Sequence, residues 1–403
     1  MRRGTLLVFL FALPAAADDW PGWRGPNRDG VSAEKRFPTR WSATENVRWK
    51  AAVPGLGVSA PIVCGDRVFL TSSGGKAGEE LYLLGYDRAD GRELWRRRMF
   101  GSELSDGQYA PGAMAVPTPT TDGKRVFALY GTGDLVCVDT DGRPVWIRSL
   151  AGEYGAFRNR WGMASSPLLI DGLLVVQVDH WTGSYLLGVD AATGKNRWKT
   201  PRGVGVNWTS PVVAGAGKDK VIVAVGTNTV KGYDPATGQE LWALPGQLPQ
   251  SIPTPVVRGD RMWVQSGQGF TSLCLRLGAD GKAAPSKEWT APSKGAEIPS
   301  PLVLGDYYYY AEDSGFVACL RADTGEPVWR RRLPAKVHAS PVAAGDTLYL
   351  TTMSGAVTVL RAGPEYKLLA RNELGEALVA SPALANGCIF LRGEKHLYCI
   401  GGK

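Results

Sequence analysis

Residues 233–242 read YDPATGQELW, and three other segments repeat this phrase: VDAATGKNRW at 189–198, YDRADGRELW at 86–95 and RADTGEPVW at 321–329. A variant one residue shorter, VDTDGRPVW, occupies residues 138–146, and weaker remnants end at Trp289 and near Leu369. Each phrase joins an Asp/Gly-containing turn to a short strand that ends in Trp. Internal repetition of this length predicts a propeller, a solenoid or an array.

A second mark follows each Trp: a Ser, Thr or Ala precedes a Pro that opens an apolar run. Successive marks lie 58, 48, 44, 44, 46, 40 and 41 residues apart, close to the period of propeller blades. Four short strands fit into each period, with no long helical pattern between them. The marks are Pro61, Pro119, Pro167, Pro211, Pro255, Pro301, Pro341 and Pro382. The sequence therefore predicts an all-β, eight-bladed propeller of four-stranded antiparallel blades.

The two ends of the chain complete each other. After Pro382 the chain has too few strands for a full blade, and the fourth strand is missing. Residues 45–53 (ENVRWKAAV) supply a spare strand, in which Trp49 precedes Pro61 by 12 residues, as Trp329 precedes Pro341. We expect this N-terminal strand to pair into the C-terminal blade and close the ring, which leaves only short, protected edges.

The N-terminus has the pattern of an export signal. Arg2 and Arg3 precede an apolar stretch, and small residues follow up to Ala17, where we place cleavage. The apolar stretch is too short to span a bilayer. The expected organisation is a signal peptide at 1–17, an irregular segment at 18–44 and the propeller at 45–403, in a periplasmic or secreted protein.

Charge and composition bound the partners. Removal of Arg2 and Arg3 lowers the net charge from +8 to +6. In an exported protein this balance favours an acidic neighbour over nucleic acid. We expect a monomer without a transmembrane segment, whose partner is an envelope protein or a cell-envelope polymer.

The cysteines occupy positions that call for a small residue. Cys137 and Cys319 stand where sister repeats have Gly, so they are expected to be buried packing residues. A two-residue hairpin turn at 393–394 would place Cys388 opposite Cys399, which makes this pair a candidate disulfide in an oxidising compartment.

Motifs for catalysis are missing. The sequence has no CxxC, GxSxG, HExxH or Walker loop, and its three histidines are scattered. We therefore expect no metal site and assign no catalytic residue.

The repeat and the Pro marks resemble those of the PQQ-like β-propeller superfamily, which includes quinoprotein alcohol dehydrogenases and the propeller of the outer-membrane assembly machinery. The dehydrogenases have adjacent cysteines, which this sequence lacks, so the resemblance is to the non-catalytic secreted members. It implies no cofactor; PQQ with calcium is the alternative. It also implies that one Trp per repeat docks between blades: Trp49, Trp95, Trp146, Trp198, Trp242, Trp289 and Trp329.

A binding site is expected where connections between blades are long. Residues 100–116 and 151–165 form two long adjacent connections, and such loops on a rigid scaffold tend to carry function. Further polar and aromatic residues fall on the same predicted face of the ring. The candidate ligand- or partner-binding residues are Tyr109, Tyr154, Arg158, Asn159, Arg160, Trp161, Asp179, His180, Trp181, Glu312, Asp313 and His338.

Two functions remain in view. The first is an exported, non-catalytic propeller that binds a protein or an envelope polymer, since a fold alone implies no chemistry. The alternative is a PQQ- and calcium-dependent dehydrogenase acting on an alcohol or sugar, with Asp179, Glu297 or Asp313 as the base. A third class, glycan hydrolysis by paired carboxylates, has no supporting spacing.

Overall fold

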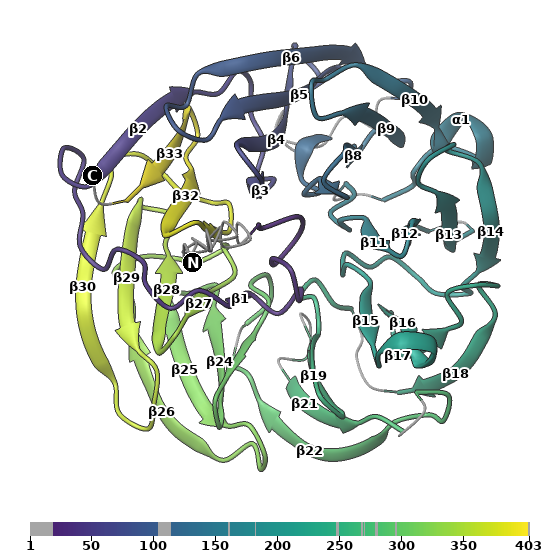
Figure 1. Ribbon diagram of the computed structural model, residues 1–403. Helices are drawn as coiled ribbons and strands as arrows, with labels where there is room; N and C mark the ends of the chain where they lie inside the picture. Colours follow the sequence, from purple (N-terminus) through teal and green to yellow (C-terminus); the bar gives the residue numbers. More distant parts are fainter. Residues whose placement is uncertain are drawn as a thin grey trace, which may run out of the picture.

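The computed structural model describes residues 19–103, 114–159, 162–181, 183–246, 250–266, 269, 271–278, 281–294 and 296–401. Eight sheets surround a central channel (Figure 1), so the expected eight-bladed propeller is confirmed. The described part adds a short helix, α1 (Leu150–Tyr154), and a 3-10 turn, η2 (Gly217–Asp219). No helix in these ranges has the length and apolarity to cross a membrane. The predicted signal peptide, 1–17, lies outside the described residues.

Each blade is a four-stranded antiparallel sheet whose strands follow one another from the channel outward. Apolar side chains alternate with polar ones on the outermost strands, while the middle strands are buried on both faces. Blade 1 has β3 (Ile62–Cys64), β4 (Arg67–Gly74), β5 (Glu80–Asp87) and β6 (Glu93–Phe100); blade 2 has β7 (Thr120–Thr121), β8 (Arg125–Leu129), β9 (Asp134–Asp139) and β10 (Pro144–Ser149); blade 3 has β11 (Leu168–Ile170), β12 (Leu173–Val178), β13 (Tyr185–Asp190) and β14 (Asn196–Pro201); blade 4 has β15 (Val212–Ala214), β16 (Val221–Gly226), β17 (Thr229–Tyr233) and β18 (Glu240–Pro245). Blade 5 has β19 (Val256–Arg258), β20 (Arg261–Gln265), β21 (Thr271–Arg276) and β22 (Ser286–Pro292); blade 6 has β23 (Leu302–Leu304), β24 (Tyr307–Glu312), β25 (Phe316–Arg321) and β26 (Pro327–Arg332); blade 7 has β27 (Val342–Ala344), β28 (Thr347–Thr351), β29 (Ala356–Arg361) and β30 (Lys367–Glu373); blade 8 has β31 (Ala383–Ala385), β32 (Cys388–Arg392), β33 (His396–Ile400) and β2 (Val47–Ala52).

Blade 8 joins the two ends of the propeller. Strand β2 pairs antiparallel with β33, and its register sets Trp49 opposite Cys399 and Ala52 opposite His396. The predicted closure is therefore confirmed. It buries the apolar side of β2 and removes the open edge that β33 would otherwise present.

One Trp on the outermost strand of a blade docks against the following blade. In its own blade Trp95 pairs with Gly85, where an added Cβ would lie 2.5 Å from the indole. This contact explains why Gly suits the position in blade 1. Each indole N–H then donates to a turn carbonyl of the next blade, at 2.8–3.1 Å. The pairs are Trp49 with Arg88, Trp95 with Thr140, Trp146 with Ala191, Trp198 with Pro235, Trp242 with Gly281, Trp289 with Ala322, and Trp329 with Gly363.

Blade 7 has no docking Trp of its own, because Ala370 stands at that position opposite Val359. Trp41, from the segment before β2, is buried there and stacks on Tyr349 with ring centroids 6.5 Å apart. Tyr349 is the counterpart of Phe69, on which Trp95 packs in blade 1. The N-terminal segment thus fills the place of the missing blade residue.

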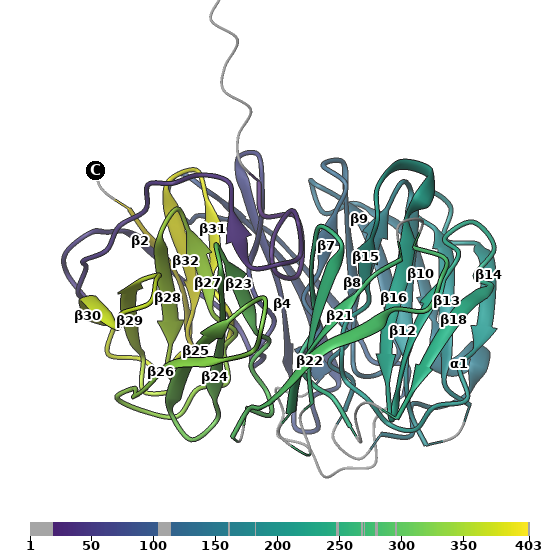
Figure 2. The same ribbon diagram turned by 90° about the horizontal axis from the view of Figure 1, so that it is seen from below.

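Residues 19–34, here called the lid, cross one end of the channel (Figures 1 and 2). Trp20 forms a bridge with Val63 of blade 1, and the short strand β1 (Val31–Ser32) adds in parallel to β27 of blade 7. The Glu34 carboxylate accepts the backbone N–H groups of Asn386 and Gly387 in blade 8. The lid therefore connects blades that are distant in sequence.

The expected hairpin at Cys388 is wrong. The turn spans more than two residues, since Arg392 pairs with Leu397, and Cys399 therefore lies opposite Phe390 rather than Cys388. Cys388 and Cys399 are both thiols in the structure. The longer turn is held by Glu376, whose carboxylate accepts the backbone N–H groups of residues 395 and 396.

Candidate functional site

A ring of hydroxyl groups lines the channel. The residue before the Pro that opens each innermost strand bears a hydroxyl in seven blades and is Ala60 in blade 1. Around the ring, the backbone N–H of one blade donates to the hydroxyl oxygen of the next blade at 2.9–3.3 Å. The hydroxyl ring consists of Thr118, Ser166, Ser210, Thr254, Ser300, Ser340 and Ser381. These hydrogen bonds link the blades along the channel.

Two residues earlier in each blade, a second ring surrounds the end of the channel opposite the lid. We call it the collar: Val58, Val116, Ala164, Trp208, Ile252, Ile298, His338 and Val379. It is apolar except for His338. Burial lowers the pKa of His338, against the opposing effect of Asp313, so this imidazole is neutral at pH 7.

Lid, hydroxyl ring and collar enclose a cavity of about 210 Å³. Trp23 of the lid forms part of its wall and donates its indole N–H to the Thr254 hydroxyl at 3.0 Å. Loops that connect consecutive blades, and loops between the second and third strands, surround the collar end. We call this end of the propeller the loop face, and all twelve candidate residues were predicted to lie on it.

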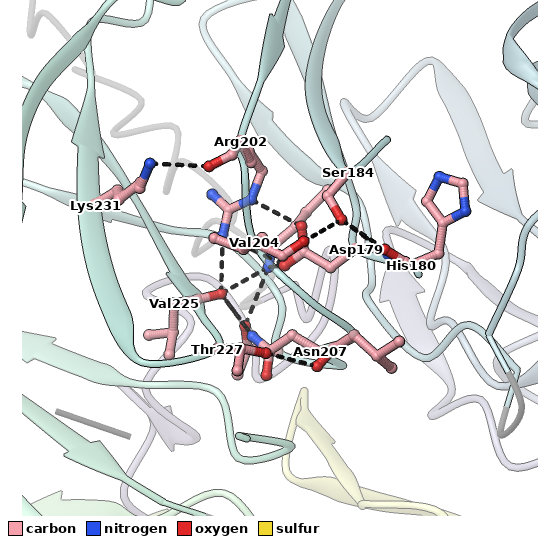
Figure 3. Close-up of polar contacts among 12 residues, drawn as sticks. Asp179, His180, Ser184, Arg202, Val204, Asn207, Val225, Thr227 and Lys231 are labelled. Carbon is pink, nitrogen blue, oxygen red and sulfur yellow. Dashed lines mark hydrogen bonds and ion pairs between the residues drawn. The ribbon is translucent and has the colours of Figure 1, made fainter. Parts of the chain in front are cut away.

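In blade 3, a buried ion pair supports the loop face (Figure 3). Arg202 donates to both Asp179 oxygens at 2.8 and 3.3 Å, and both side chains are 0% exposed. Gln177 donates a further bond to the same carboxylate at 2.7 Å. Burial raises the pKa of the Asp179 carboxyl, and the Arg202 guanidinium opposes this increase.

The loop that follows Asp179 is held in place by its own hydrogen bonds. The backbone N–H of His180 donates to the Ser184 hydroxyl, while its imidazole points away from the ion pair (Figure 3). That imidazole accepts a hydrogen bond from the backbone N–H of Arg158 at 3.1 Å. The backbone N–H of Trp181 donates to the Arg158 carbonyl at 2.9 Å. These bonds join the long connection before blade 3 to the β12–β13 loop. Trp181 is left 63% exposed beside the exposed Arg158.

Two of the twelve candidate residues do not lie on the surface of the loop face. Asp179 and Glu312 are buried in ion pairs, Glu312 with Arg330, so they support the loop face and do not line its surface. The prediction failed because each carboxylate finds an arginine 18 or 23 residues further along the chain. Asp313 accepts the backbone N–H groups of residues 297 and 298, and it lies near His338 at the collar.

The other candidates do not gather at one point. Tyr154, on α1, contacts Arg148, Asn196 and Lys199 near the outer strands of blades 2 and 3. Asn159 is buried in the long connection. Tyr109, Arg160 and Trp161 lie outside the described residues. The structure therefore brings together Arg158, His180 and Trp181 as one group, and Asp313 and His338 as another.

The hydroxyl ring was not recognised as a site feature from the sequence. The Pro marks located its residues, yet only the ring geometry shows that their hydroxyls face one cavity. Trp208 of the collar had no sequence signal, since five different residue types (Val, Ala, Trp, Ile and His) occupy that position in the repeat.

The fold and the repeats define a PQQ-like propeller. The chain belongs to the family described as outer membrane protein assembly factor BamB, whose model matches residues 38–180, 79–315, 277–364 and 317–400. Over 106 residues it is 31% identical to outer membrane protein assembly factor BamB of Burkholderia pseudomallei (strain K96243). That alignment covers 26% of this chain and 27% of the relative, about a quarter of each.

Solved structures share the fold. BamB from Moraxella catarrhalis superposes with a TM-score of 0.64 at 15% identity, over 88% of this chain and 96% of that one. The quinohemoprotein alcohol dehydrogenase from Comamonas testosteroni gives a TM-score of 0.69 at 12% identity, over 96% of this chain and 81% of the other. At these identities the likeness extends to the fold alone.

The lining of the channel does not fit the calcium ion that would accompany PQQ. Calcium takes six to eight oxygen ligands, among which carboxylates are prominent, and no Asp or Glu lines the cavity. Across the described residues, no group of three His, Cys, Asp or Glu side chains could hold a metal. Of the proposed bases, Asp179 is ion-paired and Asp313 already accepts two backbone N–H groups.

Proposed function

We propose that this protein is a non-catalytic scaffold of the cell envelope, which binds a protein of the outer-membrane assembly machinery through its loop face. The family description supports a role in the cell envelope, beside the outer-membrane assembly machinery. The observation that carries the proposal is the rigid presentation of Trp181, a large exposed aromatic side chain beside a cationic one. Trp and Arg are the residues most often found at the energetic centre of protein interfaces.

Other residues of the loop face support the choice of a protein partner over a polymer. Apolar residues are exposed on the same face: Leu56 and Val58 in the connection before β3, and Phe100 at the end of β6. Exposed apolar groups rimmed by polar ones are typical of protein-binding surfaces. The buried pair of Arg202 and Asp179 keeps the Trp181 loop in one conformation, which reduces the entropy lost on binding.

The experiment compares binding of Trp181→Ala with the wild type. The purified protein is titrated against the solubilised outer-membrane assembly complex of its own cell, and the dissociation constant is measured. We expect a loss of about tenfold to a hundredfold, since a central aromatic contributes about 2 kcal/mol or more. Ile147→Ala, on the outer strand β10 and 56% exposed, is the matched control. Absence of a complex, or equal loss in both variants, contradicts the proposal.

A PQQ-dependent dehydrogenase that uses calcium is the alternative. It predicts that PQQ and calcium together raise the melting temperature and support dye reduction with an alcohol or sugar. Our proposal expects neither effect. Any ligand that binds only the folded state must stabilise it, so the thermal readout does not depend on knowing the substrate.

A further inference from the structure

The hydroxyl ring presents hydrogen-bond donors to the cavity. Each oxygen accepts a backbone N–H from the preceding blade, and Thr254 accepts the Trp23 indole N–H as well. A Ser or Thr hydroxyl that accepts still has one hydrogen to donate. Within the described ranges, none of the seven hydroxyls donates to a protein acceptor, and all seven side chains are at least nine-tenths buried. The cavity is thus surrounded by unused O–H donors.

Two arginines lie directly behind this wall. Arg24 donates to the carbonyl of Ser300, and Arg392 donates to the carbonyl and hydroxyl of Ser59, the neighbour of Ala60. Both residues are 2% exposed or less. Neither forms a direct ion pair among the residues that the structure describes, although the Asp29 carboxylate of the lid interacts electrostatically with Arg24. A buried charge without a partner is unfavourable, so a counter-charge nearby would stabilise the fold.

Both guanidinium groups are charged under ordinary conditions. Burial lowers the pKa of Arg24 and of Arg392 to about 10, which is still well above neutral pH. Asp29 of the lid, like Glu297 and Asp313 near the collar, lies outside the cavity lining. Two buried cations therefore lie behind the wall of a space whose own lining has no acidic group.

We propose that the cavity binds a small monovalent anion of the halide class, held by hydroxyls of the ring. Hydrogen bonds from O–H groups to an anion are stronger than bonds between neutral groups. The ion would complete the hydrogen-bonding capacity of the ring and supply negative charge near Arg392, for which the described residues provide no carboxylate partner. It would thereby couple the ionic composition of the medium to the stability of the blade junctions.

Bromide is the probe, because its anomalous scattering identifies its position. Crystals grown in sodium bromide are expected to show an anomalous peak inside the hydroxyl ring. In solution, bromide and chloride should raise the melting temperature with a saturable dependence on concentration, whereas equal concentrations of gluconate should not. A cavity without a bromide peak, together with equal melting temperatures in bromide and gluconate, overturns the proposal.

Two variants test the role of the ring itself. Ser210→Ala removes one donor and should weaken bromide binding about tenfold, while Ala60→Ser adds an eighth hydroxyl and should strengthen it. Thr200→Val is the control, since its hydroxyl donates to the Gly238 carbonyl at 2.7 Å away from the channel. Equal bromide affinity in all three variants contradicts coordination by the ring, even if each variant folds with altered stability.

Discussion

Replacement of Arg202 by Met is expected to destabilise the protein strongly at neutral pH. The guanidinium is 0% exposed and donates to Asp179 at 2.8 and 3.3 Å, to the Tyr233 hydroxyl at 3.1 Å and to the Val225 carbonyl at 3.1 Å. Met fills similar space but leaves the Asp179 carboxylate buried with Gln177 as its remaining side-chain donor. Breaking a buried pair in this way costs about 3–5 kcal/mol of unfolding free energy.

The pH dependence gives this prediction its sharpest test. Without Arg202, the pKa of Asp179 in the folded state rises further above its ordinary value of 3.8. A carboxyl whose pKa is higher in the folded state than in the unfolded state contributes stability that is fully present below its unfolded pKa. This stability is lost as pH rises through its folded-state pKa. The difference between Arg202→Met and the wild type should therefore shrink as pH falls from 7 to 4.

Urea unfolding at both pH values measures the effect. Arg197→Met, which breaks the exposed pair with Asp190 in the same blade, is the control and should cost about 1 kcal/mol or less. The double variant Arg202→Met with Asp179→Leu should regain most of the loss, since it removes both charges. A deficit for Arg202→Met below about 1 kcal/mol, or one that is the same at pH 7 and pH 4, would refute the reasoning on buried charge.

Three further predictions concern the blade junctions. Trp41→Ala should lower the unfolding free energy by about 3–5 kcal/mol, as for a core Trp, although Trp41 lies outside the repeats; a value near zero in calorimetry or urea unfolding would show that the indole does not fill blade 7. Gly142→Ala should destabilise by about 2 kcal/mol or more, because φ is +79° and an added Cβ would lie 2.5 Å from Trp95. Gly123→Ala, with φ +87° and open space around it, should cost about 1 kcal/mol, and equal melting temperatures of the two variants would contradict this account. Ala60→Ser should stabilise by about 0.5–1.5 kcal/mol if its hydroxyl accepts the N–H of the preceding blade, and thermal unfolding without added halide checks this.

The sequence predicts the ring well because its determinants are local and repeated. A turn phrase, a Trp and a Pro mark recur in each period, and the spare strand around Trp49 matches the incomplete blade after Pro382. Trp41 could not be assigned in the same way. It lies in an irregular segment, and its contact with Tyr349 joins residues more than 300 positions apart without any shared pattern.

The candidate site was predictable only in part. Long loops led to the prediction of a site on the loop face, and Arg158, His180 and Trp181 do come together there. The role of Asp179 was not predictable, because a carboxylate in a loop can be exposed or buried with equal sequence support. Its burial depends on Arg202 folding back over the end of β12, a tertiary contact that no periodicity encodes.

The pairing of β2 with β33 in blade 8 has a consequence for the synthesis and folding of the protein. Residues 47–52 emerge from the ribosome long before residues 396–400, with which they pair. Throughout synthesis the chain therefore contains an unpaired strand near its start. The ring of blades stays open until this strand can pair with the C-terminal blade. Closure of the ring by β2 and β33 is a single late step, and it carries a large entropic cost because it joins the two ends of a long loop. Any helper that shields unfinished sheets is needed until the last few residues have appeared.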